Sequence, residues 1–123
     1  MPASRYAHCM VTLHDGKIMI LGGYLGGPRK LRDPKLKSVM IFNPEDNTFT
    51  SGPSLLFGRV RFGCALFQSP LHENRPVILA AGGDGTYSRN PRNTAEVLDY
   101  TNTIEWQQSK LINTFSIIGE FSN

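Results

Sequence analysis

Two short apolar runs each end on a pair of glycines, and this repeated feature constrains the fold most. The first run covers residues 18–21 and ends at Gly22 and Gly23, and the second covers residues 77–81 and ends at Gly82 and Gly83. An apolar run that stops at glycine is typical of a buried strand ending where the backbone turns or approaches another segment closely. The pairs lie 60 positions apart (82 minus 22) with similar neighbours in the same order, so we expect an internal repeat.

Each glycine pair belongs to a series of strand patterns. In the first series, residues 6–13 alternate between two sets of side chains, and Asp15-Gly16 then marks a hairpin turn. The strands expected in the first series are residues 6–13, 17–21, 39–42 and 48–51, and those in the second are residues 61–67, 77–83, 95–100 and 105–108. Aligning residues 61–67 with residues 5–11 gives an offset of 56, so we expect four extra residues (60 minus 56) in the turn before the second glycine run.

Length, composition and charge exclude several classes of protein. The chain has 123 residues, about one domain, with 40% hydrophobic and 19% charged residues and 12 glycines, which is typical of an ordered, loop-rich globular protein. A formal charge of +3 is far from that of a dedicated nucleic-acid binder. No apolar stretch has the length of a membrane span or a signal peptide, so we expect a cytoplasmic protein with neither a membrane nor a nucleic acid as partner.

The two cysteines, Cys9 and Cys64, are too few to form a disulfide framework. Both lie inside apolar strand patterns. We therefore expect two buried free thiols, as in an intracellular protein.

The recurring positions resemble a pair of kelch repeats. The kelch unit is about 50 residues long and builds one four-stranded blade of a β-propeller. Its pattern has an Arg before the first strand, a His within it, a double Gly after the second strand, and then an aromatic residue and a Trp. The first unit fits at Arg5, His8, Gly22, Gly23, Phe42 and Phe49, and the second at Arg61, Gly82, Gly83, Tyr100 and Trp106, with Cys64 in place of the His.

This resemblance implies an all-β fold of two four-stranded kelch-type blades, incomplete as a single chain. The expected divisions are a first repeat at residues 3–56, a second at 57–108 and a divergent tail at 109–123. Propellers usually have about 4 to 8 blades, and closure of the ring buries the faces between them. Two blades alone would leave apolar faces bare. We expect either a fragment of a longer propeller or a homo-oligomer in which several copies close one ring. The aromatic residues Phe49 and Trp106 are expected to pack between blades, and Arg5 and Arg61 to bind backbone carbonyls.

Phosphate and metal sites have weak support. The glycines from Gly22 to Gly27 are followed by Pro28 rather than by the Lys of a phosphate-binding loop. His8 and Cys9 are adjacent in a strand pattern and point to opposite sides of the sheet, so they cannot ligate one ion together. No acid, base and nucleophile occur in a catalytic pattern either. We predict no catalytic residue, no metal site and no cofactor.

The best functional candidate is the basic loop after the second strand of the first unit. Residues 24–38 carry five basic side chains and one acidic one, a charge of +4, and residues 84–94 carry two basic and one acidic, a charge of +1. The resemblance implies that loops at this point bind partner peptides, so we expect a scaffold that binds a protein with an acidic segment. Alternatively, the charges only solvate long loops. The expected contacts are Tyr24, Arg29, Lys30, Arg32, Lys35, Lys37, Tyr87, Arg89 and Arg92.

An enzyme is the alternative from a different class. Galactose oxidase has a kelch-like propeller that carries copper, and Tyr, His and Cys side chains form its site. The present chain has no matching motif, so a role as a fragment of such a carbohydrate oxidase is the second hypothesis. Stoichiometric copper in the purified chain would favour it.

Overall fold

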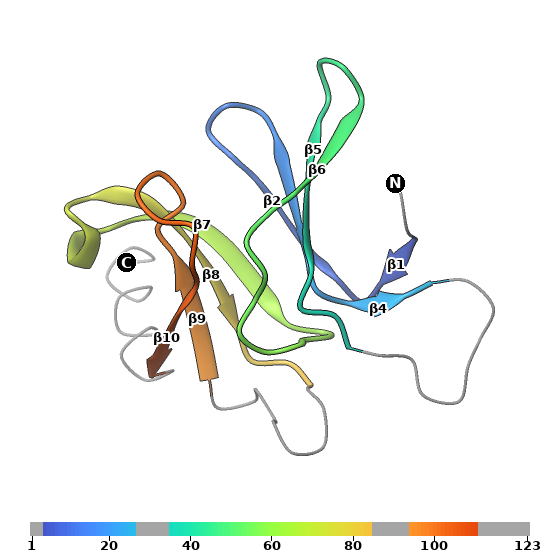
Figure 1. The fold of residues 1–123 in the computed structure, drawn as a ribbon. Helices are drawn as coiled ribbons and strands as arrows, with labels where there is room; N and C mark the ends of the chain where they lie inside the picture. The colour runs from blue at the N-terminus through green and yellow to red at the C-terminus, as the bar shows by residue number, and fades with distance from the viewer. Residues whose placement is uncertain (1–3, 27–34, 85–93, 111–123) are drawn as a thin grey trace.

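The described residues form two four-stranded antiparallel sheets that pack face to face (Figure 1). A computed structural model describes residues 4–26, 35–84 and 94–110. The predicted all-β class and four-stranded blades are confirmed. The predicted tail at 109–123 lies outside the described residues from 111 onwards.

The first sheet, which we call blade 1, has the strand order β2-β3-β5-β6. Its strands are β2 (Cys9–Thr12), β3 (Ile18–Leu21), β5 (Val39–Asn43) and β6 (Thr48–Ser51). The hairpin between β2 and β3 closes at the predicted turn, where the Leu13 N–H donates to the Lys17 carbonyl at 2.8 Å and Gly16 has a φ of 87°. Sequence alternation, with tight turns before β3 and after β5 and a long connection from β3 to β5, therefore gives a simple up-and-down blade.

The second sheet, blade 2, repeats this order as β7-β8-β9-β10. Its strands are β7 (Gly63–Ser69), β8 (Arg75–Ala81), β9 (Thr94–Leu98) and β10 (Gln107–Lys110), with a short 3-10 helix, η1 (Pro70–His72), between the first two. Cys9 pairs with Leu21 in blade 1, and Gly63 pairs with Ala81 in blade 2. The first strands are therefore related by an offset of 54 (63 minus 9) rather than the predicted 56. The turn before β8 consequently has six extra residues (60 minus 54) rather than four.

A two-stranded sheet of β1 (Arg5–Tyr6) and β4 (Tyr24–Leu25) lies beside the glycine pair of blade 1. Gly22 has a φ of 59°, and a Cβ there would lie 2.7 Å from the Arg59 carbonyl oxygen. Gly23 has a φ of 91°, and a Cβ there would lie 2.7 Å from the Tyr6 carbonyl oxygen. These positions need glycine both for the left-handed backbone and for the close approach of other chain segments.

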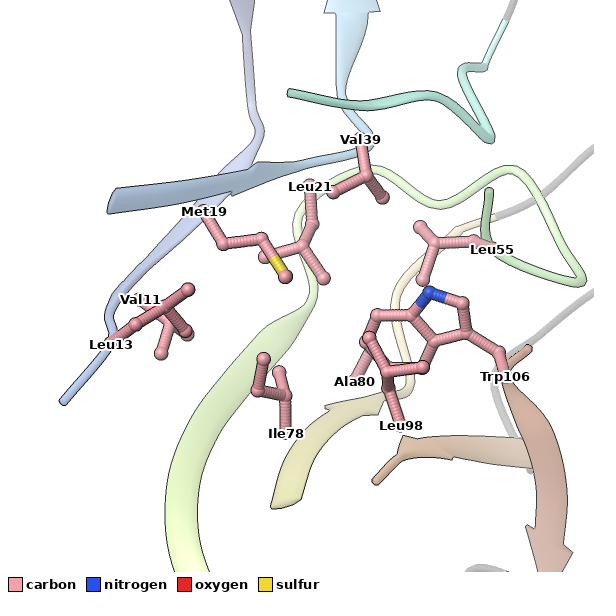
Figure 2. Close-up of a cluster of buried hydrophobic side chains, with 10 residues drawn as sticks. All are labelled: Val11, Leu13, Met19, Leu21, Val39, Leu55, Ile78, Ala80, Leu98 and Trp106. Carbon is pink, nitrogen blue, oxygen red and sulfur yellow. The ribbon is translucent and has the colours of Figure 1, made fainter. Parts of the chain in front are cut away.

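The core lies between the two blades (Figure 2). Blade 1 and the loops beside it contribute Val11, Leu13, Met19, Leu21, Val39 and Leu55, and blade 2 contributes Ile78, Ala80, Leu98 and Trp106. Trp106 is 3% exposed, and its Nε1 donates to the Pro53 carbonyl at 2.9 Å. It lies between the blades, where the resemblance implies it.

The two blades present opposite faces to each other. Met19 of blade 1 faces the core, whereas its equivalent in blade 2, Leu79 (offset 60), lies on the other face of its sheet. Conversely, Ile78 and Leu98 face the core, whereas their equivalents Ile18 and Phe42 lie on the outer face of blade 1. The interface is therefore heterologous, the head-to-tail type that a series of blades can repeat.

The prediction of two free thiols is wrong, because Cys9 and Cys64 form a disulfide in this structure. Their Cα atoms are 6.2 Å apart, within the usual range for a disulfide. Cys9 lies on β2 and Cys64 on β7, and both side chains are directed to the space between the blades. Only blade packing brings these residues, 55 positions apart, to one place.

Candidate partner-binding end of the blade pair

Three of the nine predicted contact residues are described by the structure: Tyr24, Lys35 and Lys37. Tyr24 lies on β4 and forms a β-bridge with Lys35, so the two ends of the first loop are held together. Lys37 is exposed, while its carbonyl accepts a hydrogen bond from the Leu55 N–H at 2.8 Å. The other predicted contacts, Arg29, Lys30, Arg32, Tyr87, Arg89 and Arg92, lie outside the described residues.

An aromatic pair, of which Tyr6 is exposed and Tyr24 half-buried, lies at the base of the first loop. The rings of Tyr6 and Tyr24 have centroids 5.0 Å apart and are inclined by 31°. Tyr6 is 47% exposed and the neighbouring Leu25 is 43% exposed. Tilted aromatic rings at this distance attract each other and offer a rigid surface that is both apolar and polar. The sequence indicated Tyr24 but missed Tyr6, because only the pairing of β1 with β4 brings Tyr6 beside it.

The second loop leaves blade 2 at the same end of the molecule. Val60 and Asp84 form a β-bridge with two backbone hydrogen bonds of 3.0 Å, in the place that Tyr6 and Tyr24 take in blade 1. Arg61 is exposed and forms an ion pair with Asp84 at 3.6 Å. Backbone contacts join the two loop bases, as the Arg61 N–H donates to the Ala7 carbonyl at 2.9 Å. Both loops therefore start from one rigid base (Figure 1).

A buried guanidinium holds each loop base. Arg5 donates from Nη1 to the Gly22 carbonyl at 2.9 Å and to the Ser38 carbonyl at 3.0 Å. In blade 2, Arg59 donates from Nη1 to the Gly82 carbonyl at 2.9 Å and to the Thr94 carbonyl at 3.1 Å. Arg59, not Arg61, is thus the equivalent of Arg5, at the same offset of 54 as the first strands.

A buried ion pair completes the guanidinium site in blade 2. The side chains of Arg59 and Glu96 are both 0% exposed, and Arg59 Nε lies 2.9 Å from Glu96 Oε2. The carboxylate also accepts hydrogen bonds from the backbone N–H groups of Leu56, at 2.6 Å, and Phe57, at 3.1 Å. Burial lowers the pKa of Arg59, and the hydrogen bond and charge of Glu96 oppose that shift. Met40 occupies the place of Glu96 in blade 1, so the sequence repeat gave no signal for this pair.

Two other predicted repeat positions differ from the structure. Leu98, rather than Tyr100, is the equivalent of Phe42, because Ile18 pairs with Phe42 and Ile78 with Leu98. The offset of 54 places Phe62, rather than Cys64, where blade 1 has His8. His8 itself is half-buried, with its Cβ 2.8 Å from the position that a Cβ on Gly23 would take.

Phe49 does not lie between the two described blades. It is half-buried on the outer face of blade 1, where its ring lies 4.8 Å from that of Phe42. Packing between blades therefore stays a prediction for Phe49, whereas its equivalent Trp106 does lie between the two described blades.

A small cavity beside β9 has charged groups that are paired with one another. Arg75 donates from Nη2 to Asp99 at 2.7 Å and from Nη1 to Glu73 at 2.8 Å. The hydrogen bond that Arg75 donates to Asp99 is the largest cause of the raised pKa of Arg75. Among the described residues, no group of three or more His, Cys, Asp or Glu side chains has the arrangement of a metal site.

Comparison with known families identifies the first repeat. The kelch motif model matches residues 5–56, which include the whole of blade 1. No curated protein matches the chain. Within the described ranges, no helix has the length and apolar character needed to cross a bilayer. The double glycine after the second strand, the four-stranded blade and the matched motif together identify residues 5–56 as a kelch motif.

Proposed function

We propose that the chain is a protein-interaction scaffold that binds a partner through the loops following β3 and β8, without catalysing a reaction. Kelch motifs are common in such scaffolds. The compartment that we propose is the cytoplasm. The partner segment is acidic, because residues 24–38 carry a charge of +4 and residues 84–94 a charge of +1.

One observation carries this proposal: the bases of both loops lie at the same end of the blade pair and are hydrogen-bonded to each other. Gly23 donates its N–H to the Arg59 carbonyl at 2.8 Å, and Arg61 donates to the Ala7 carbonyl at 2.9 Å. Loops on a rigid base lose less conformational freedom when they bind, which favours recognition. The exposed Tyr6 ring and the half-buried Tyr24 ring provide an aromatic contact at the base of the first loop.

We also propose that further blades cover the outer face of blade 1. Met10 on this face is 59% exposed, and Phe42 and Phe49 are half-buried. The equivalent face of blade 2 is buried against blade 1, with Ile78 and Leu98 each 0% exposed. A blade from a longer chain or from another copy would bury the outer face in the same manner. The oligomeric state of the chain in solution, measured by light scattering, tests this proposal.

The loop proposal is tested by charge reversal. Peptides are selected from a displayed library on the immobilised chain, and their affinity is measured by fluorescence polarisation. The triple change Arg29→Glu, Lys30→Glu and Arg32→Glu should abolish binding while leaving the circular-dichroism spectrum intact, because repulsion replaces attraction at the loop. The control is Lys17→Glu, which reverses an exposed charge in the β2–β3 turn, at the other end of β3 from Gly22. Equal binding by the triple variant and the control would contradict the proposal.

A further inference from the structure

The disulfide between Cys9 and Cys64 lies at one edge of the blade interface. In the described sheets, β2 is the edge strand of blade 1 and β7 is the edge strand of blade 2. The bond therefore joins two edge strands that no backbone ladder connects. Cys64 Sγ also lies 3.7 Å from the Met10 carbonyl oxygen.

Other contacts hold the blades together away from this edge. Trp106 precedes β10, at the opposite side of blade 2 from β7, and donates to the Pro53 carbonyl at 2.9 Å. At the loop end, Gly23 and Arg61 form backbone hydrogen bonds to Arg59 and Ala7. Between these points lies the buried core (Figure 2). The blade pair thus has noncovalent attachments on two sides and a covalent one at the β2–β7 edge.

We infer that the Cys9–Cys64 bond is a reversible redox lock on the β2–β7 edge of the blade interface. Both cysteines are half-buried, so a reductant has access to the bond. A dithiol reductant attacks one sulfur, breaks the S–S bond through a mixed disulfide and leaves as its own cyclic disulfide. The protein gains two electrons and two protons and becomes two thiols. A reducing compartment such as the cytoplasm favours the form with two thiols, and an oxidising compartment favours the form with the disulfide.

The lock acts locally because the other contacts between the blades do not depend on the disulfide. After reduction, β2 and β7 lose their link, whereas Trp106 and the loop-end hydrogen bonds keep their partners. An edge strand held on one side only is the element that opens most readily. Reduction should therefore increase the mobility of β2 and β7 without unfolding blade 2.

The test compares the full chain in its oxidised and dithiol-reduced states. Thiol titration in denaturant should find no free thiol before reduction and two after it. Hydrogen exchange followed by mass spectrometry should show β2 and β7 amides exchanging about tenfold faster or more in the reduced state, while β9 amides and Trp106 fluorescence stay unchanged. Removal of the reductant under an oxidising glutathione buffer should restore the slow exchange.

The double change Cys9→Ser and Cys64→Ser is the matched control, since its exchange should not respond to reductant. The wild-type comparison needs no variant, so the test stands even if that control folds poorly. Two free thiols in the chain purified under oxidising conditions would overturn the inference. Equal exchange in both states would overturn it as well, and so would complete unfolding on reduction, which would make the bond a static staple.

Discussion

The substitution Arg59→Met tests the assignment of the buried guanidinium site. In the structure, Arg59 holds two backbone carbonyls, the Thr94 hydroxyl at 2.9 Å and the Glu96 carboxylate at 2.9 Å. Methionine retains much of the side-chain volume but leaves Glu96 as a buried charge without its cation. Breaking a buried ion pair in this way costs about 3–5 kcal/mol. Because the Leu56 and Phe57 N–H groups still donate to the carboxylate, we expect the free energy of unfolding to fall by an amount near the lower end of this range, about 3 kcal/mol.

A matched control lies two residues away. Arg61 is 68% exposed and pairs with Asp84 at 3.6 Å, so Arg61→Met should change the stability by less than about 0.5 kcal/mol. Urea unfolding followed by circular dichroism measures both variants under the same conditions. Adding Glu96→Gln to Arg59→Met should recover part of the loss, because it removes the uncompensated charge.

Equal destabilisation by Arg59→Met and Arg61→Met would refute this reasoning. So would a double variant that is less stable than Arg59→Met alone, since the buried charge would then not be the source of the cost. A domain of this kind has a free energy of unfolding of about 5–15 kcal/mol, so a loss of about 3 kcal/mol is measurable without complete unfolding.

Two further predictions concern the faces of the blades. Trp106→Ala should destabilise the chain by about 3–5 kcal/mol in urea unfolding, because it opens a cavity between the blades and leaves the Pro53 carbonyl without its donor. Phe49→Ala, at the equivalent position on the outer face of blade 1, should cost less. Equal costs would show that Trp106 has no special place in the interface. The chain should self-associate in light scattering or bind a hydrophobic dye in a fluorescence assay, in either case through the outer face of blade 1. Phe42→Ser should weaken either effect. A monodisperse monomer that binds no dye would exclude an uncovered outer face.

The sequence predicted the strands well but placed part of the second repeat two residues out of register. It aligned Arg61 with Arg5 and Tyr100 with Phe42, whereas the structure has Arg59 and Leu98 at these places. Side chains alternate with a period of two along a strand, so a shift by two residues preserves the pattern of inward and outward positions. Periodicity alone therefore could not detect the error, and burial of the Arg59 guanidinium decides between the alternatives.

The candidate binding end was predictable in part. Loop charge and the position of each loop after a glycine pair follow directly from the order of the residues. The pairing of Tyr6 with Tyr24 does not, because it depends on β1 and β4 meeting across a stretch of 18 positions (24 minus 6). The same holds for Glu96, which binds a backbone segment about 40 residues earlier in the chain.

Local patterns by themselves determined the four-stranded unit, its repetition and the points where glycine is required, because alternation, turn residues and left-handed backbone are properties of short segments. Only the tertiary structure decided which face of each blade is buried and that Cys9 meets Cys64. Contacts between residues more than 50 positions apart depend on how two completed sheets pack, and side-chain volumes and buried charges at the interface set that packing.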